Sequence, residues 1–320
     1  MISAARPPDH GAAILVGTIG GILVAASIAG AILHFTARSD QARRTIANIN
    51  ARIRAWWVMA AVFAGAIAMG PGGACVLFAL VSFFALREML TLAPTRRADH
   101  HTMFWAFFVI IPLQYLIIYR TAPLYDLFEI FIPVYCFLFL AIRGTLVGDY
   151  KNYLERTAKI QWGVMICVYC VSFAPALLMV DVPGYRQDWR LLVFLVLIVQ
   201  MSDVLQYCWG KSLGRRKIAP TISRNKTWEG FVGGVLSATA LGAALYRITP
   251  FTPGQAAGIS LTIAILGFFG GIVMSAIKRD AGIKDYGHLI AGHGGMMDRI
   301  DSLTFAAPVF YRIVRHWFSA

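Results

Sequence analysis

The sequence predicts an all-α protein, a polytopic transmembrane helical chain with about ten spans and both termini outside. Composition points to this class, because 58% of the 320 residues are hydrophobic and only 14% are charged. The mean hydropathy of +0.65 lies far above that of a soluble domain. Apolar stretches long enough to cross a hydrocarbon core of roughly 30 Å also recur along the whole chain.

These apolar stretches define the expected spans in chain order. They lie near residues 12–34, 55–70, 73–91, 103–119, 126–142, 160–180, 189–208, 230–248, 254–276 and 302–318. The first is longer than the apolar core of a signal peptide, and its Arg-rich segment follows it, so we expect an uncleaved helix. Cys167 and Cys170 form a CxxC inside an apolar span without a second pair, which favours packing over metal binding.

Basic residues give the expected orientation. Most Lys and Arg residues fall in alternate connections, beginning with the one that follows the first span. By the positive-inside rule these connections are cytoplasmic, which places both termini outside. The net charge of +13 is then a consequence of topology, so we expect no nucleic acid partner.

The chain divides into an N-terminal transmembrane region, 1–200, and a C-terminal transmembrane region, 201–320, that carries the polar motifs. In the first region, Arg87 and Glu88 at the inner end of the third span suggest a snorkelling ion pair or a headgroup contact. In the second, Asp203 lies inside a span or at its cytoplasmic end. An acid at that depth is a functional candidate by default.

The stretch after Asp203 is rich in breaks and cations. Gly210, Gly214 and Pro220 predict a loop rather than a helix. Its Lys and Arg residues could neutralise a triphosphate or a lipid phosphate, or anchor the topology on anionic lipid. Glu229 is expected in the first turn of the next helix, where a carboxylate favours the dipole.

A second concentration of charge lies in the segment 275–301, between two apolar stretches. Charge beside hydrocarbon is costly and calls for a function. Asp285, Asp298 and Asp301 offer hard oxygen ligands of the kind that Mg²⁺ prefers. Asp298 and Asp301 are three residues apart, so they share one face of a helical turn.

Glycines and lysines of this segment fit phosphate chemistry. The Gly-rich turn 292–295 lets the backbone approach a phosphate closely. Lys278 and Lys284 could stabilise charge on a leaving pyrophosphate. Each feature alone also fits a solvated ion pair or a tight turn, and their combination favours a site.

The pattern SAIKR-x4-KD-x-G-x4-G-HGG-x2-DRID closely resembles the signature of the CDP-diacylglycerol synthases, also called phosphatidate cytidylyltransferases. The upstream stretch with GRRKIAP and S-x2-KTWEG resembles another region of that family, and the likeness covers about 202–310. It implies an integral enzyme of the bacterial inner membrane, commonly a homodimer, with its site facing the cytoplasm. The implied reaction condenses CTP with phosphatidate to CDP-diacylglycerol and pyrophosphate in phospholipid synthesis, with Mg²⁺ as cofactor.

The resemblance also implies roles for matching residues, among them Glu229. The implied catalytic residues are Lys278, Lys284, Asp285, Asp298 and Asp301, and of these Asp285, Asp298 and Asp301 hold the metal. The implied substrate-binding residues are Ser223, Lys226, Arg279, His293, Gly294 and Gly295. The lipid phosphate would attack the α-phosphorus of CTP directly, so positioning and charge neutralisation carry the catalysis.

The sequence departs from the family pattern in places. Gly271 and Met274 stand where many members have acids, one of which is expected to help bind metal. Other departures are Gln206, Arg224 and Ala291. The chain therefore resembles a divergent branch, in which either fewer acids suffice, with Asp203 contributing, or the activity or substrate has changed. The alternatives are a related transferase on another membrane lipid phosphate and a non-catalytic lipid-binding or transport protein.

Overall fold

The computed structural model describes residues 17, 20–21, 23–25, 27–32, 40–92, 96–120, 125–185, 189–287 and 294–319. The described residues form two compact units, one reaching Ala64 and a larger one that begins at Gly65. The first unit contains most of helix α2 (Asp40–Ala68). Inside it, Trp57 Nε1 donates a hydrogen bond to Ser27 Oγ at 3.1 Å.

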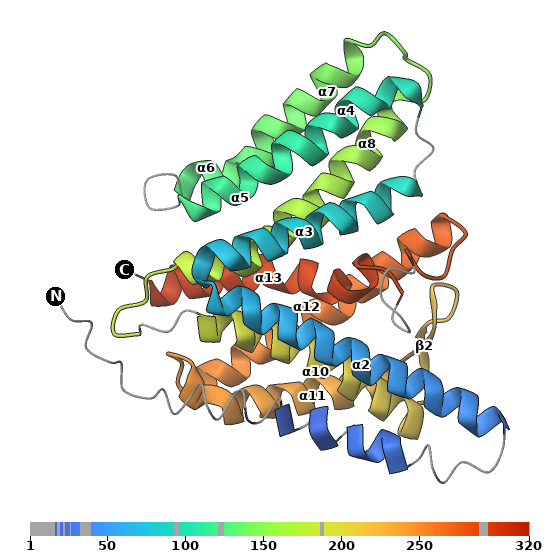
Figure 1. Cartoon of the computed structure of the whole chain (residues 1–320), viewed down its shortest axis with the longest axis vertical. Helices are drawn as coiled ribbons and strands as arrows, with labels where there is room; N and C mark the ends of the chain where they lie inside the picture. Colours follow the sequence, from blue (N-terminus) through green and yellow to red (C-terminus); the bar gives the residue numbers. More distant parts are fainter. Residues whose placement is uncertain are drawn as a thin grey trace. The chain divides into compact units, whose positions relative to one another are not determined.

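The larger unit is helical apart from one short hairpin, among the described residues (Figure 1). Its first elements are α3 (Gly70–Thr91), η1 (Arg97–Asp99), α4 (His100–Trp105), η2 (Ala106–Ile110), α5 (Ile111–Tyr119), α6 (Tyr125–Ile130), η3 (Phe131–Cys136) and α7 (Phe137–Thr145). There follow α8 (Tyr153–Val164), η4 (Met165–Cys170), α9 (Val171–Ala176), η5 (Leu177–Met179), α10 (Trp189–Leu213), β1 (Lys217–Ala219), β2 (Ser223–Thr227), α11 (Trp228–Ala244), η6 (Leu245–Ile248), α12 (Pro253–Asp280) and α13 (Met297–Phe318).

Three spans contain a wide turn in mid-helix. The segments η2, η3 and η4 are π-helical, and each continues directly into an α-helix. Pro112, Pro133 and Pro175 lie in or shortly after these segments. Proline cannot donate the backbone hydrogen bond that an α-helix needs, and a π turn is one way to absorb the mismatch. The two α-helices that each π-helical segment joins therefore form one long span.

The predicted fold class is confirmed. Eight helical segments of the described chain are long and apolar enough to cross a membrane. They are Ile49–Ala68, Gly70–Thr91, Arg97–Tyr119, Tyr125–Thr145, Tyr153–Met179, Trp189–Leu213, Trp228–Ile248 and Pro253–Asp280. The predicted span at 302–318 is helical within α13, which carries more charge than these eight. Much of the first predicted span, 12–34, lies outside the described residues, so the count of ten stays a prediction.

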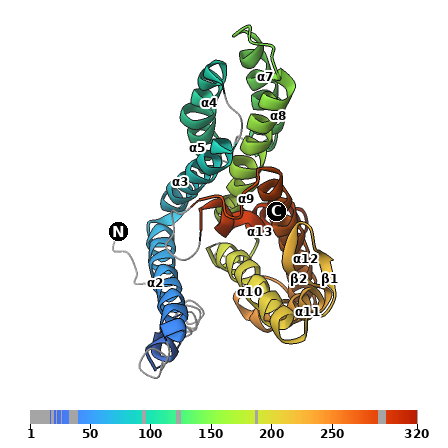
Figure 2. The ribbon, with the colours of Figure 1, turned by 90° about the vertical axis from the view of Figure 1, so that its right-hand side faces the viewer.

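Four C-terminal helices form the part of the larger unit that matters for the site. Helices α10, α11 and α12 lie side by side, and α13 packs along α12 (Figures 1 and 2). Glycines allow the closest approach: a Cβ on Gly230 would lie 2.9 Å from Gly210 Cα, and one on Gly234 would lie 2.6 Å from Gln206 Cα. Phe231 and Phe268 then close the α11–α12 contact with ring centroids 4.5 Å apart.

The stretch after α10 that was predicted as a loop rather than a helix contains a short antiparallel hairpin. Lys217 pairs with Thr227, and Ala219 pairs with Ser223. Helix α10 continues through Gly210 and ends at Leu213, directly before Gly214. The hairpin leads directly into α11, and β2 contacts α10, α11 and α12.

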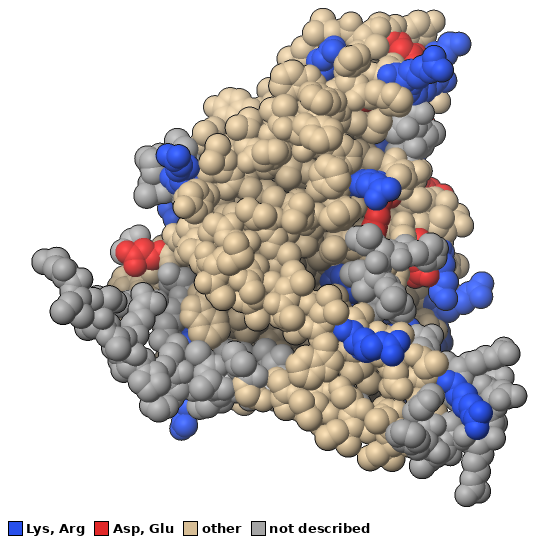
Figure 3. All heavy atoms as spheres, in the orientation of Figure 1, with Lys and Arg blue, Asp and Glu red and all other residues tan. Residues whose placement is uncertain are grey.

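Charged side chains gather near the ends of the helices. On the face in Figure 3, Lys, Arg, Asp and Glu lie mainly toward the two sides, and a broad band without these charged residues runs between them. This distribution is expected of helices that cross a hydrocarbon layer, because charge is costly there.

The connection between α7 and α8 is held by a buried arginine. Arg156 is 5% exposed, and its Nη1 donates to Asp149 Oδ2 at 2.8 Å. Its Nε lies 3.4 Å from Asp99 Oδ1. The hydrogen bond from Arg156 lowers the pKa of the Asp149 carboxyl below its usual value. The stabilisation from this carboxylate is therefore present above its unfolded-state pKa and is lost as pH falls through the lower folded-state pKa.

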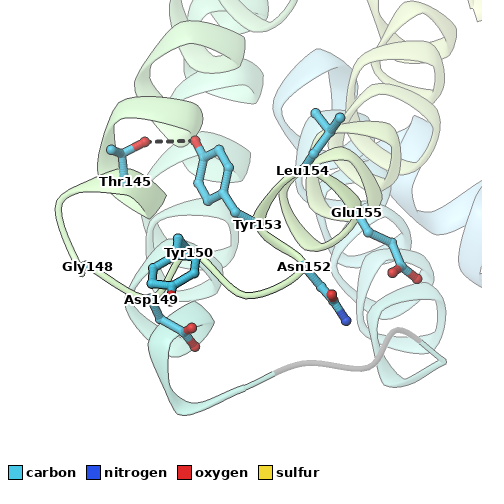
Figure 4. A pocket seen from close by; sticks show the side chains of 8 residues that line it. All are labelled: Thr145, Gly148, Asp149, Tyr150, Asn152, Tyr153, Leu154 and Glu155. Carbon is cyan, nitrogen blue, oxygen red and sulfur yellow. Dashed lines mark hydrogen bonds between the residues drawn. The ribbon is translucent and has the colours of Figure 1, made fainter.

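This connection also borders a hollow of about 730 Å³ (Figure 4). Tyr153 lines it, and Thr145 Oγ1 donates to the Tyr153 hydroxyl at 2.9 Å. The acids in its lining already have partners, since Asp149 binds Arg156 and Glu155 binds Lys159. The acids that line the hollow are therefore engaged in ion pairs of the α7–α8 connection and of α8.

Replacing Arg156 with methionine is expected to lower the free energy of unfolding by about 3 kcal/mol, because it strands a buried carboxylate at Asp99. The measurement is the thermal midpoint of the purified protein in detergent. Lys159→Met removes an exposed i,i+4 pair and serves as the control, with an expected change below about 0.5 kcal/mol. Equal midpoints for the two variants would contradict the structural role of Arg156.

Candidate active site

Asp298, in the first turn of α13, joins three segments. Its Oδ1 accepts a hydrogen bond from Lys278 Nζ at 2.9 Å, and the two side chains are only 7% and 12% exposed. Its Oδ2 accepts the backbone N–H groups of Tyr286 at 2.9 Å and Gly295 at 3.0 Å. Asp298 therefore fastens the end of α12 and both sides of the α12–α13 connection to one point.

The glycine before this anchor is needed for its geometry. Gly294 has a φ of +80°, a conformation that L side chains rarely adopt. A Cβ on Gly294 would also lie 2.8 Å from Asp298 Oδ2. The glycine at position 294 thus allows the backbone to pass close to the Asp298 carboxylate.

A second carboxylate caps α13 from another part of the chain. Glu88 Oε1 accepts the N–H of Met296, and Glu88 Oε2 accepts the N–H of Met297, both at 2.9 Å. A helix N-terminus exposes unpaired N–H groups and a positive dipole, which a carboxylate satisfies. Glu88 therefore connects α3 to the beginning of α13.

Lys226 reaches the same region from the hairpin. Its Nζ donates to the Phe268 carbonyl at 3.1 Å and lies 4.6 Å from the centroid of the Phe268 ring. Burial lowers the pKa of the Lys226 ammonium, and the carboxylates of Asp203 and Asp301 oppose that shift. The hairpin therefore presents a cation to acids from two separate helices.

Asp203 of α10 and Asp301 of α13 form an acid pair beside these lysines. The two carboxylates interact electrostatically with each other, and both interact with Lys226. Asp301 also interacts with Lys278. Its Oδ1 accepts the N–H of Ser302 at 2.8 Å. Two like charges brought together in a poorly solvated place require cations, which the lysines supply in part.

The match to known families decides what kind of site this is. Residues 50–317 match the cytidylyltransferase family. The chain belongs to this family. The resemblance seen in the sequence is therefore confirmed, and the four-residue cluster of Asp203, Lys226, Lys278 and Asp301, called the acid–lysine cluster below, lies inside the matched region.

Relatives of this cytidylyltransferase family member fall into two groups. A protein of Escherichia coli (strain K12), named uncharacterized protein YnbB, is 42% identical over 84% of this chain and 88% of its own length. Phosphatidate cytidylyltransferases of Staphylococcus aureus (strain COL) and Brucella abortus biovar 1 (strain 9-941) are 32% and 38% identical. These matches cover 45% and 38% of this chain, and 56% and 45% of the two relatives' lengths.

Asp285, Asp298 and Asp301 do not form one metal-binding group in the described part of this family member, although Asp298 and Asp301 lie in the same turn of α13. Asp285 is exposed in the turn after α12, and both oxygens of Asp298 are taken by Lys278 and by backbone N–H groups. Within the described part of the chain, no group of three or more His, Cys, Asp or Glu side chains could hold a metal. Asp203 and Asp301 do fit a divalent cation, because two carboxylates from separate helices provide the hard oxygens that such a cation prefers.

The predicted substrate-binding residues occupy varied positions. Ser223 begins β2 and is half-buried, and Lys226 lies in the same strand with its Nζ at the Phe268 carbonyl. Lys284, which was predicted as a catalytic residue, is exposed after α12. Arg279 donates from Nε to the Ile222 carbonyl at 3.1 Å and from Nη1 to the Ile283 carbonyl at 2.8 Å. Arg279 thus braces the hairpin against the turn after α12. Three further positions complete the set: Gly294 and Gly295 lie at the Asp298 anchor, and His293 lies outside the described residues.

Glu229 has a role in the fold as well as a place in the motif. It lies in the first turn of α11, as predicted, and accepts the backbone N–H groups of Arg215 and Arg216. Those contacts close the loop that precedes β1. The basic residues of the loop therefore keep a defined backbone although their side chains are exposed.

Gly271, which departs from the family pattern, lies against the Lys226 side chain. A Cβ on Gly271 would lie 2.7 Å from Lys226 Nζ and 3.6 Å from Ser302 Oγ. A larger side chain at this position would therefore enter the acid–lysine cluster and displace the lysine. The glycine leaves that space to Lys226.

Sequence reasoning assigned Glu88 differently from the structure. We expected a snorkelling ion pair with Arg87 or a headgroup contact, and the carboxylate instead binds the backbone of Met296 and Met297. A single acid at the end of an apolar helix gives no indication of a partner about 200 residues away. The pattern that could have raised the question is the lone acid itself, which is costly near hydrocarbon.

Proposed function

We propose that this protein condenses CTP with phosphatidate to give CDP-diacylglycerol and pyrophosphate. Family membership supports a cytidylyltransferase, and relatives from two bacterial species carry the name phosphatidate cytidylyltransferase. The observation that carries the proposal is the electrostatic interaction among two lysines and two acids from four elements: α10, β2, α12 and α13. Such a set suits a polyphosphate with a bound cation.

The reaction is a substitution at phosphorus. A phosphate oxygen of phosphatidate attacks the α-phosphorus of CTP, and the bond from that phosphorus to the oxygen bridging to the β-phosphorus breaks. Pyrophosphate leaves with the electron pair. The attacking oxygen is already an anion, so the protein has to position the two phosphates and neutralise their charge.

The residues of this chain divide that work. Lys226 and Lys278 neutralise negative charge that grows on the pyrophosphate. Asp203 and Asp301 would hold Mg²⁺, which when bound would neutralise phosphate charge and orient the triphosphate. Asp298 and Arg279 act through other groups, because Asp298 orients Lys278 and Arg279 fixes the hairpin that carries Lys226.

The membrane setting suits this chemistry. Lys278 lies in the last turn of α12, Asp203 lies in the C-terminal half of α10, and the basic hairpin contacts both helices. The positive-inside rule assigns the C-terminal ends of these helices to the cytoplasm, where CTP is available. The inner membrane, the cytoplasmic orientation and a homodimer remain parts of the proposal that rest on sequence.

The lipid substrate is the least constrained part of the proposal. The relative with 42% identity over 84% of this chain carries no activity in its name, so another membrane lipid phosphate is the alternative substrate. The acid–lysine cluster would recognise the phosphate in either case. Contacts to the rest of the lipid would set the choice.

The test is a direct assay of the purified protein in detergent micelles. Labelled CTP, phosphatidate and Mg²⁺ should yield labelled CDP-diacylglycerol and pyrophosphate in equal amounts. Parallel reactions replace phosphatidate with lysophosphatidate or a polyprenyl phosphate, and CTP with ATP, GTP or UTP. Product only with phosphatidate and CTP supports the proposal. Product with another lipid phosphate alone assigns that lipid instead, and no product with any pair would refute cytidylyl transfer.

A further inference from the structure

We propose that Glu88 is a positioning residue for the active site, acting as a carboxylate clamp that sets the beginning of α13. This inference rests on the proposed function. Glu88 lies in the last turns of α3, in the N-terminal region where the sequence offered little chemistry. Its two oxygens accept the N–H groups of Met296 and Met297, one each, at 2.9 Å.

A carboxylate suits this place better than an amide. Both oxygens accept hydrogen bonds, and both bonds are charge-assisted. The positive end of the α13 dipole adds to the attraction. A glutamine at position 88 would present one oxygen and one NH₂ group, and the NH₂ group would face a backbone N–H instead of accepting from it.

Glycines show that the surrounding chain is built to receive this carboxylate. A Cβ on Gly287 would lie 2.8 Å from Glu88 Oε1, and a Cβ on Gly295 would overlap Glu88 Oε2. Backbone on both sides of 288–293 therefore comes within contact of one side chain, at two positions where only glycine leaves room. A surface acid that merely snorkels would not need such clearance.

The same junction is packed on its apolar side. Cys167 Sγ lies 3.6 Å from Met89 Sδ and 3.7 Å from Met297 Sδ. Met89 follows Glu88 directly in α3, and Met297 is the first residue of α13. The polar clamp and the sulfur contacts thus fix the same two helices at one point.

The clamp matters for chemistry because the next residues of α13 belong to the active site. Asp298 comes directly after Met297, and Asp301 lies within the next turn. Asp298 holds Lys278, and Asp301 interacts electrostatically with Asp203, Lys226 and Lys278. A shift in the beginning of α13 therefore displaces Asp301 relative to the lysines. Displacements of about 1 Å can cost roughly 100-fold in rate.

Three variants test the clamp: Glu88→Gln, Glu88→Asp and the matched control Glu155→Gln, which alters an exposed glutamate of α8. The first readout is amide hydrogen exchange in the peptide 294–301, which needs no turnover. We expect exchange about tenfold faster in Glu88→Gln, because two amides lose charge-assisted acceptors. Glu155→Gln should match the wild type.

The second readout is steady-state cytidylyl transfer with CTP, phosphatidate and Mg²⁺ each varied. We expect kcat to fall about 10- to 100-fold in Glu88→Gln with a much smaller change in KM for CTP, because the catalytic groups are displaced while the nucleotide contacts remain. Glu88→Asp keeps the charge on a shorter side chain and should recover part of kcat. The thermal midpoint is recorded for each variant to confirm that the folded protein is being compared.

The outcomes separate this inference from the proposed function. Unchanged exchange in Glu88→Gln would show that the clamp does not exist in solution. Faster exchange with unchanged kcat would show that Glu88 only stabilises α13, which also overturns the positioning role. A wild-type protein without cytidylyl transfer to any lipid phosphate overturns the proposed function and this role together, whereas an active wild type with an equally active Glu88→Gln overturns this role alone.

Discussion

Replacing Asp301 with asparagine is expected to lower kcat/KM for CTP by about 100- to 1,000-fold. The substitution keeps the size of the side chain and removes the charge that faces Lys226, Lys278 and Asp203. It also removes a carboxylate that we propose as a ligand for Mg²⁺, so the Mg²⁺ concentration needed for half-maximal rate should rise. Pyrophosphate release from CTP and phosphatidate measures both effects.

The control for this variant is Asp280→Asn, which alters an exposed aspartate at the end of α12. It should retain wild-type kinetics. The thermal midpoint of Asp301→Asn should not fall, because an uncharged side chain relieves the repulsion with Asp203. A wild-type rate and Mg²⁺ dependence in Asp301→Asn would show that the acid pair does not serve the reaction.

Replacing Lys278 with alanine is expected to reduce both activity and stability. Its removal leaves the Asp298 carboxylate, 7% exposed, without a cation, which should cost about 3 kcal/mol. It also removes a cation from the acid–lysine cluster, with an expected loss of about 100-fold in kcat. Thermal midpoint and cytidylyl transfer are measured on the same preparation.

Two further variants separate the effect of Lys278 on stability from its effect on activity. Lys278→Ala combined with Asp298→Asn should recover most of the stability, because no uncompensated charge remains, but none of the activity. Lys151→Ala changes an exposed lysine and should behave as the wild type. The assignment of Lys278 to both roles fails if Lys278→Ala retains normal turnover and a normal midpoint.

The spans could be predicted because membrane helices leave a strong local pattern. A run of about 20 apolar residues is enough to indicate a span, and eight such segments were found where the sequence predicts them. Local chemistry also gave Glu229 its place in the first turn of α11. The short hairpin was missed, because Lys217–Ala219 is too short and too charged to show a strand pattern.

The site was also predicted only in part, because sequence patterns report residues that are close together along the chain. Motif spacing brought Lys278 and Asp298 into one segment, but it could not show that Asp298 is already saturated by a lysine and two backbone N–H groups. Partners far apart in sequence depend on the tertiary fold. For this reason the sequence marked Asp203 as a functional candidate only because it is an acid in a membrane span, without naming its partners. The partners of Glu88 could not be predicted for the same reason.

The most direct test of the central claim is a kinetic double-mutant cycle on Asp203→Asn and Asp301→Asn. If the two acids act as one unit on one polyphosphate, each single variant should lose most of the activity, and the double variant should be within about tenfold of the slower single variant. Losses that multiply fully in the double variant, or a single variant with the wild-type rate, would contradict a shared site.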